Sequence, residues 1–143
     1  MTIAVEKVLY TAKATAQGGR DGKVATNDGK LDVVVAPPVE MGGGGKGTNP
    51  EQLFAAGYAA CFHSALKLVA RKTRQDADGS TVTAEVGIGP INGGAGYGLE
   101  VVLEVSLPGV DRAIAEELVA KAHEVCPYSN ATRGNIKVDL KVA

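Results

Sequence analysis

The chain has 143 residues, a length that suits one compact domain better than two. A hydrophobic share of 45% and a charged share of 22% are ordinary for a globular protein and argue against a disordered chain. The 15 Lys and Arg residues nearly balance the 16 Asp and Glu residues, which removes the basic surface that a nucleic-acid-binding protein needs. We therefore expect a single domain over residues 1–143 and no nucleic-acid partner.

Three short strands are predicted before the middle of the chain. Their alternating pattern and β-favouring residues place them at residues 8–16, 23–26 and 31–35. Turn sequences rich in Gly, Asn and Asp separate them, which is typical of hairpins. Two prolines, Pro37 and Pro38, end the third strand, and a glycine-rich loop follows at residues 42–47.

A long helix is predicted to begin at Pro50 and to continue to about Lys72. Thr48 or Asn49 can cap it, and proline suits the first helical position. Residues 53–62 are apolar on every face, so we expect this half of the helix to be buried on all sides. This run of ten apolar residues is too short to cross a membrane. No signal peptide is recognisable either, so a cytoplasmic location and no membrane partner are expected.

The rest of the chain predicts a hairpin, a second helix and a last strand. Residues 81–88 and 99–107 alternate between apolar and polar side chains, as in an antiparallel pair with one solvated face. Asp111 can cap a helix that ends before Pro127, and residues 136–142 alternate again. The predicted order βββ-α-ββ-α-β indicates an α+β fold with helices packed against antiparallel sheet.

The two cysteines, Cys61 and Cys126, are the candidates for chemistry, because a reducing cytoplasm rarely holds structural disulfides. Cys61 lies in the middle of the long helix, where a small buried hydrophobe is the alternative. As a nucleophile it needs a lowered pKa, and the helix N-terminus is too far away to provide one. A cation must then come from elsewhere in the fold. Cys126, at the end of the second helix, is either reachable or simply buried.

Arg20 and Glu51 are the charged candidates. Arg20 is the possible cation, and the alternative is a solvated charge at a glycine-rich hairpin tip. Glu51 is equally explained as an acid that the helix dipole favours in the first turn. The pattern of residues alone does not connect either of them with Cys61.

A metal site and a phosphate-binding loop are both disfavoured. Cys61 and His63 are two positions apart on a helix, so their side chains point about 200° apart and cannot share a metal with His123 and Cys126. In the glycine-rich loop, Gly47 stands where a phosphate loop requires Ser or Thr. We expect no metal and no cofactor.

Three stretches carry a resemblance to a known family. They are VLYTA at residues 8–12, TNPEQLFAAGYAACF at 48–62 and VCPYSNATRGN at 125–135. Together they resemble the organic hydroperoxide resistance proteins of the OsmC/Ohr superfamily of thiol peroxidases. The resemblance implies an OsmC-like fold in an intertwined homodimer, with long central helices sandwiched by sheets. It also implies reduction of organic hydroperoxides to alcohols, with a dihydrolipoyl dithiol as the reductant.

The resemblance further implies roles for the candidate residues. Cys61 would be the peroxidatic cysteine, Cys126 the resolving cysteine that forms a disulfide with it, and Arg20 and Glu51 the charged pair of the site. Glu51 and Cys61 are separated by about 15 Å along one helix, so we hypothesise that Arg20 and Glu51 of one subunit meet both cysteines of the other. A redox sensor, a small-ligand binding module, or an osmotically inducible peroxidase with broader peroxide use are the alternatives.

Overall fold

The computed structural model describes residues 2–143, and their contacts divide the chain into two units, residues 1–50 and 51–143. Each unit is described by itself, and the single domain over residues 1–143 stays a prediction. The α+β class and the order of the predicted elements are confirmed, with one additional short α-helix and two 3₁₀ helices.

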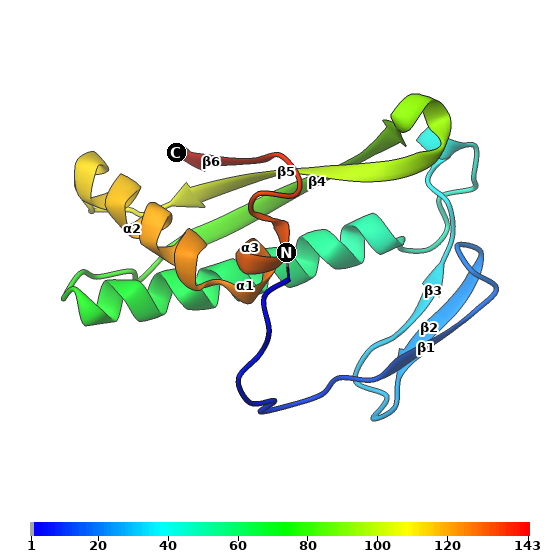
Figure 1. Ribbon diagram of the computed structural model, residues 1–143, viewed down its shortest axis with the longest axis horizontal. Helices are drawn as coiled ribbons and strands as arrows, with labels where there is room; N and C mark the ends of the chain where they lie inside the picture. Colours follow the sequence, from blue (N-terminus) through cyan, green and yellow to red (C-terminus); the bar gives the residue numbers. More distant parts are fainter. Residues whose placement is uncertain (1) are drawn as a thin grey trace. The chain divides into compact units, whose positions relative to one another are not determined.

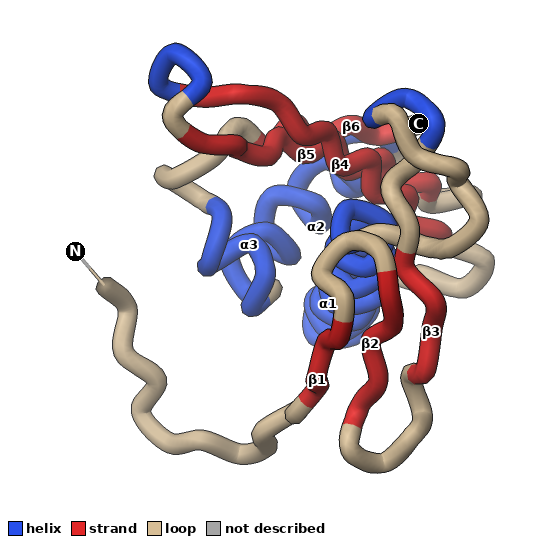
Figure 2. Tube along the Cα trace, turned by 90° about the vertical axis from the view of Figure 1, so that its right-hand side faces the viewer, coloured by secondary structure: helices blue, strands red, loops and turns tan. Residues whose placement is uncertain are grey.

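The first unit is a meander of three antiparallel strands (Figure 2), with the bounds β1 (Ala14–Gln17), β2 (Gly22–Thr26) and β3 (Asp32–Val35). A tight turn at residues 18–21 joins β1 to β2, where the Asp21 N–H donates to the Gly18 carbonyl at 3.1 Å. A one-turn 3₁₀ helix, η1 (Val39–Met41), follows β3. The chain then returns so that Thr48 forms a parallel bridge with Val35.

The predicted first strand is too long. Residues 8–13 are not in a strand, and Val8, Leu9 and Tyr10 are exposed. The reason is pairing: the register between β1 and β2 ends at Ala14 opposite Thr26, where β2 enters its turn. Apolar alternation marks a potential strand, but a strand forms only where a neighbour supplies hydrogen bonds.

The second unit contains a three-stranded sheet in the order β4-β5-β6, formed by β4 (Thr81–Ile91), β5 (Gly96–Ser106) and β6 (Val138–Val142). β4 and β5 form the predicted antiparallel hairpin, joined by the 3₁₀ turn η2 (Asn92–Gly94). β6 pairs with β5 in parallel, which corrects the prediction of a wholly antiparallel sheet. Two helices lie between β5 and β6 in sequence, and this long crossover lets the two strands run in the same direction.

Three helices cover one face of this sheet (Figures 1 and 2), namely α1 (Pro50–Lys72), α2 (Arg112–Val125) and α3 (Pro127–Thr132). Pro127 ends α2 as predicted, but it also begins α3, which the sequence analysis missed. Asp111 occupies the predicted cap position of α2, yet its side chain makes no capping hydrogen bond.

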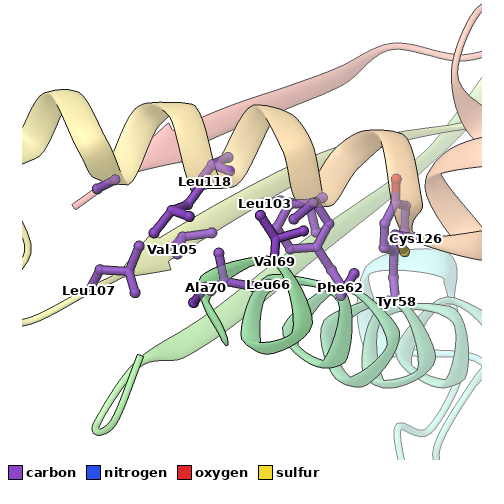
Figure 3. Close-up of a cluster of buried hydrophobic side chains, with 14 of the residues drawn as sticks. Tyr58, Phe62, Leu66, Val69, Ala70, Leu103, Val105, Leu107, Leu118 and Cys126 are labelled. Carbon is purple, nitrogen blue, oxygen red and sulfur yellow. The ribbon is translucent and has the colours of Figure 1, made fainter. Parts of the chain in front are cut away.

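The core of the second unit lies between α1, α2 and the sheet (Figure 3). β5 contributes alternate residues, since Val101, Leu103 and Val105 are buried, and Leu107 directly after the strand continues the pattern, which confirms the predicted inner face. α1 contributes a stripe with helical spacing, and its buried residues are Tyr58, Phe62, Ala65, Leu66, Val69 and Ala70. Tyr58 and Cys126 lie together at one end of this core.

Within the single chain that the structure describes, α1 is not buried on all sides. Ala56 and Ala60 are exposed, and Leu53 is only half-buried, because the core occupies one face of the helix. By length and a mean hydropathy of 1.4, α1 would also suffice to cross a membrane, but the core helix of a soluble protein meets the same criterion, so this is weak evidence for a span.

Candidate active site

The two cysteines meet in the second unit. Cys61 comes from the middle of α1 and Cys126 from the junction of α2 and α3, and their Sγ atoms are 3.4 Å apart. A disulfide bond requires about 2.05 Å, so both side chains are free thiols in direct contact. Cys126 is fully buried, whereas Cys61 retains some exposure. An oxidant can therefore reach Cys61 more readily than Cys126.

The junction between α2 and α3 places the Cys126 sulfur. Cys126 has extended backbone angles, φ −61° and ψ 124°, and is both the C-cap of α2 and the N-cap of α3. Its N–H donates to the Ala122 carbonyl at 2.9 Å, and its carbonyl accepts from the Asn130 N–H at 2.9 Å. Proline follows it because the first helical position needs no N–H donor. The residue is thus held by hydrogen bonds on both sides.

The surroundings of Cys61 raise its pKa. Burial is the largest cause, because it disfavours the charged thiolate. The backbone N–H of Tyr128 donates to the Cys61 sulfur and opposes the rise, while the adjacent Cys126 thiol adds to it. These neighbours do not supply the positive charge that a reactive thiolate requires.

A buried polar network lies beside the thiols and was missed by the sequence analysis. The Tyr58 hydroxyl is 2.8 Å from Ser129 Oγ and 3.0 Å from Thr132 Oγ1. Ser129 Oγ is also 2.7 Å from His123 Nδ1. The available signal was Tyr58 itself, since a tyrosine within an apolar helix must find a partner for its hydroxyl.

An aromatic cluster lines the same end of α1. The ring centroids of Phe54 and Tyr128 are 5.8 Å apart, and those of Tyr58 and Tyr128 are 5.5 Å apart. The Tyr128 ring rests against Gly57, where an added Cβ would lie 2.5 Å from the tyrosine Oη. Phe54 and Tyr128 are only partly buried, whereas Phe62 is fully buried.

Arg20 and Glu51 belong to different units. Arg20 is exposed in the turn between β1 and β2 of the first unit. Glu51 lies in the first turn of α1, about 15 Å along the helix axis from Cys61. Their participation in the site stays a prediction.

The two histidines have local partners. His63 Nε2 is 2.9 Å from Ser80 Oγ, a contact that joins α1 to the start of β4. His123 contacts Ser129, as described above. Within residues 2–143, no group of three or more His, Cys, Asp or Glu side chains is arranged to hold a metal ion.

The comparisons with known proteins identify the family of this chain. The family described as OsmC-like protein matches residues 43–141. An organic hydroperoxide resistance protein of Xanthomonas axonopodis pv. citri is 56% identical over 140 residues, which cover 96% of this chain and 97% of the relative. The crystal structure of an organic hydroperoxide resistance protein from Elizabethkingia anophelis is 54% identical, with a TM-score of 0.90 over 96% of this chain and 98% of that one. The chain belongs to the organic hydroperoxide resistance branch of the OsmC/Ohr superfamily.

A second solved member of the superfamily gives the same result. The organic hydroperoxide resistance protein OsmC from Legionella pneumophila is 51% identical, with a TM-score of 0.91 over 96% of this chain and 99% of that one. The relatives and the solved structures match along nearly the whole length of the chain. The family resemblance seen in the sequence is confirmed.

Proposed function

We propose that this chain is a cysteine-based thiol peroxidase that reduces organic hydroperoxides to alcohols in defence against oxidative stress. The observation that carries the proposal is the 3.4 Å contact between a partly exposed Cys61 and a buried Cys126. A pair of free thiols in contact can pass from dithiol to disulfide with little movement of the backbone. The names of the relatives, organic hydroperoxide resistance proteins, supply the substrate class.

The reaction begins at Cys61. Its thiolate attacks one peroxide oxygen, the O–O bond breaks, and the alkoxide leaves as an alcohol after taking up a proton, so that Cys61 becomes a sulfenic acid. The Cys126 thiol then attacks the Cys61 sulfur, a water molecule leaves, and the two sulfurs form a disulfide. A dithiol, by proposal a dihydrolipoyl group or a lipoylated protein, reduces this disulfide by exchange and is itself oxidised.

Arg20 and Glu51 complete the proposal. The Arg20 guanidinium would stabilise the Cys61 thiolate and hydrogen-bond the peroxide oxygens, and Glu51 would hold the guanidinium by a bidentate ion pair. Such a cation is needed because burial raises the pKa of Cys61. No metal or cofactor takes part, and the location is cytoplasmic.

We also propose a homodimer in which Arg20 and Glu51 of one subunit serve the cysteines of the other. Two observations support it. Glu51 and Cys61 are separated by about 15 Å along α1, and the apolar residues Ala56 and Ala60 of this helix are exposed in the single chain. An exposed apolar helix face is most simply covered by a second copy of the chain.

Turnover tests the function. The reduced protein is mixed with cumene hydroperoxide and excess dihydrolipoamide, and loss of hydroperoxide is followed over many equivalents. Catalytic loss supports the peroxidase, whereas consumption that stops at one equivalent per subunit indicates a redox sensor, and none at all a binding module. A faster reaction with hydrogen peroxide than with cumene hydroperoxide would place the chain with the osmotically inducible peroxidases.

Subunit complementation tests the shared site. Arg20→Ala and Cys61→Ser chains are unfolded, mixed in equal amounts and refolded. If Arg20 acts across the dimer, each mixed dimer has one complete site, and random pairing gives about a quarter of wild-type activity. If Arg20 acts within its own chain, no mixed dimer has a complete site, and activity stays at the level of the separate variants.

A further inference from the structure

A buried tyrosine hydroxyl on the helix that carries Cys61 contacts the segment that carries Cys126 at two points. Tyr58 lies on α1, three residues before Cys61, and is fully buried. Its hydroxyl contacts both Ser129 Oγ, at 2.8 Å, and Thr132 Oγ1, at 3.0 Å. Both of these hydroxyls belong to α3, the short helix that begins directly after Cys126. The network therefore bridges the two elements whose sulfurs must meet.

The bridge is fully satisfied and shielded from water. Tyr58 and Ser129 are 0% exposed and Thr132 is 4% exposed. No buried side-chain polar atom in the described residues lacks a hydrogen-bond partner, so each hydroxyl has a role in the network. Hydrogen bonds of this kind specify one arrangement, because losing one partner leaves the others buried without compensation.

A six-residue helix is not held in place by its own hydrogen bonds alone. Its position depends on packing and on contacts such as those of Tyr58. A shift of α3 moves Cys126 with it, because Cys126 is the N-cap of this helix and its carbonyl accepts from Asn130. The contact of 3.4 Å between the two sulfurs is thus linked to the hydroxyl of Tyr58.

We propose that Tyr58 is a positioning residue for the second chemical step, in which it holds α3 through Ser129 and Thr132 so that Cys126 reaches oxidised Cys61. The inference rests on the proposed peroxidase function. In this step the Cys126 sulfur bonds to the Cys61 sulfur, the S–O bond of the sulfenic acid breaks, and its oxygen leaves as water. The first step, the attack of Cys61 on hydroperoxide, does not use Cys126.

The proposal therefore predicts that loss of the Tyr58 hydroxyl affects the rate of disulfide formation more than the rate of Cys61 oxidation. Tyr58→Phe keeps the buried ring and removes only the hydroxyl, so it is the sharpest variant. Tyr97→Phe is the matched control, because Tyr97 is 73% exposed on β5. A second pair keeps the test independent of Tyr58: Thr132→Val removes one hydroxyl of the network, and Thr132→Ser retains it.

The experiment measures how the Cys61 sulfenic acid partitions between the disulfide with Cys126 and further oxidation to the sulfinic acid. Stopped-flow mixing of the reduced protein with cumene hydroperoxide gives the rate of the first oxidation and of disulfide formation. Intact mass at increasing hydroperoxide gives the concentration at which sulfinic acid competes with the disulfide. For Tyr58→Phe and Thr132→Val we expect disulfide formation about three- to tenfold slower, the scale of one lost hydrogen bond. The first oxidation should be slowed less, because α3 contacts the attacking Cys61 sulfur only through the Tyr128 N–H.

Over-oxidation should then begin at a hydroperoxide concentration lower by the same factor, while Tyr97→Phe and Thr132→Ser behave as wild type. The inference would be overturned if the sulfenic acid partitioned between disulfide and sulfinic acid in Tyr58→Phe as it does in the wild type. It would also be overturned if both oxidation steps were slowed equally. If Tyr58→Phe does not fold, the Thr132 pair decides by the same criteria.

A second oxidant separates this inference from the proposed function. Diamide takes up two electrons and two protons and converts a dithiol to a disulfide without hydroperoxide. A failure of the wild-type protein to consume hydroperoxide would contradict the proposed function alone. Slower diamide-driven disulfide formation in Tyr58→Phe would still support the positioning role, and an unchanged rate there would contradict it.

Discussion

Oxidation of the reduced protein with one equivalent of organic hydroperoxide is expected to raise its thermal stability, because a Cys61–Cys126 disulfide closes a long loop of chain. The two residues are 65 positions apart, and a loop of this length gives a maximal stabilisation of roughly 4 kcal/mol through the lost entropy of the unfolded chain. The sulfurs must approach by about 1.4 Å from their distance of 3.4 Å, which costs part of this gain.

We therefore expect a net gain of roughly 2–4 kcal/mol in the free energy of unfolding. For a chain of this length, this corresponds to a rise in Tm of about 5–15 °C. Differential scanning calorimetry of the reduced and oxidised protein measures the difference, and intact mass confirms the loss of two hydrogens per chain. Cys126→Ser, which cannot form the disulfide, is the control and should show no rise.

Two results would refute this reasoning. One is an unchanged or lowered Tm in protein whose mass shows a complete intramolecular disulfide, since the bond would then strain the fold by as much as it restricts the unfolded chain. The other is a disulfide that links two chains on a non-reducing gel, since the 3.4 Å contact within one chain would then not represent the pair that oxidises.

Three further substitutions test the site. Cys126→Ser should consume one equivalent of hydroperoxide per subunit and then stop, with Cys61 advancing to the sulfinic acid by intact mass, whereas a sustained wild-type rate would exclude Cys126 from the cycle. Arg20→Ala should raise the pKa of Cys61, because burial then acts on the thiol without a compensating cation. Thiolate absorbance at 240 nm and alkylation by iodoacetamide should both shift to higher pH. An unchanged titration would remove Arg20 from the site. Gly57→Ala would place a Cβ 2.5 Å from the Tyr128 Oη, so the ring must move. After a gain in helix propensity of about 1 kcal/mol, the net free energy of unfolding in urea should fall by up to about 2 kcal/mol. Equal or higher stability would show that the ring moves freely.

The elements that could be predicted from the sequence are those with strong local signals. The long helix runs from Pro50 to Lys72 as predicted, because proline marks its start and its apolar residues recur along its length. The hairpin of β4 and β5 follows from simple alternation. What local pattern does not contain is pairing, so neither the short β1 nor the parallel direction of β6 could be obtained from it.

The missed helix α3 shows how one residue type carries two signals. Pro127 predicts the end of a helix, but proline is also favoured at the first position of the next helix. Because α3 carries Ser129 and Thr132, whose hydroxyls contact Tyr58, the hydrogen-bond network beside the cysteines could not be predicted without this helix. Without α3, no local sequence pattern connects the Cys126 segment with α1, and only the family resemblance does.

The environment of Cys61 could not be predicted because it is assembled from distant parts of the chain. Residue types identified the thiols, but their contact depends on how α3 packs against α1, 65 residues away in sequence. The same packing brings the Tyr128 N–H to the Cys61 sulfur, a donor that partly offsets the effect of burial on the pKa. A thiol in the middle of a helix is beyond the reach of that helix's own N-terminus, so its stabilisation has to come from other elements. One such element, α3, also carries the second thiol at its N-cap, and any movement of α3 therefore alters the environment and the partner of Cys61 together.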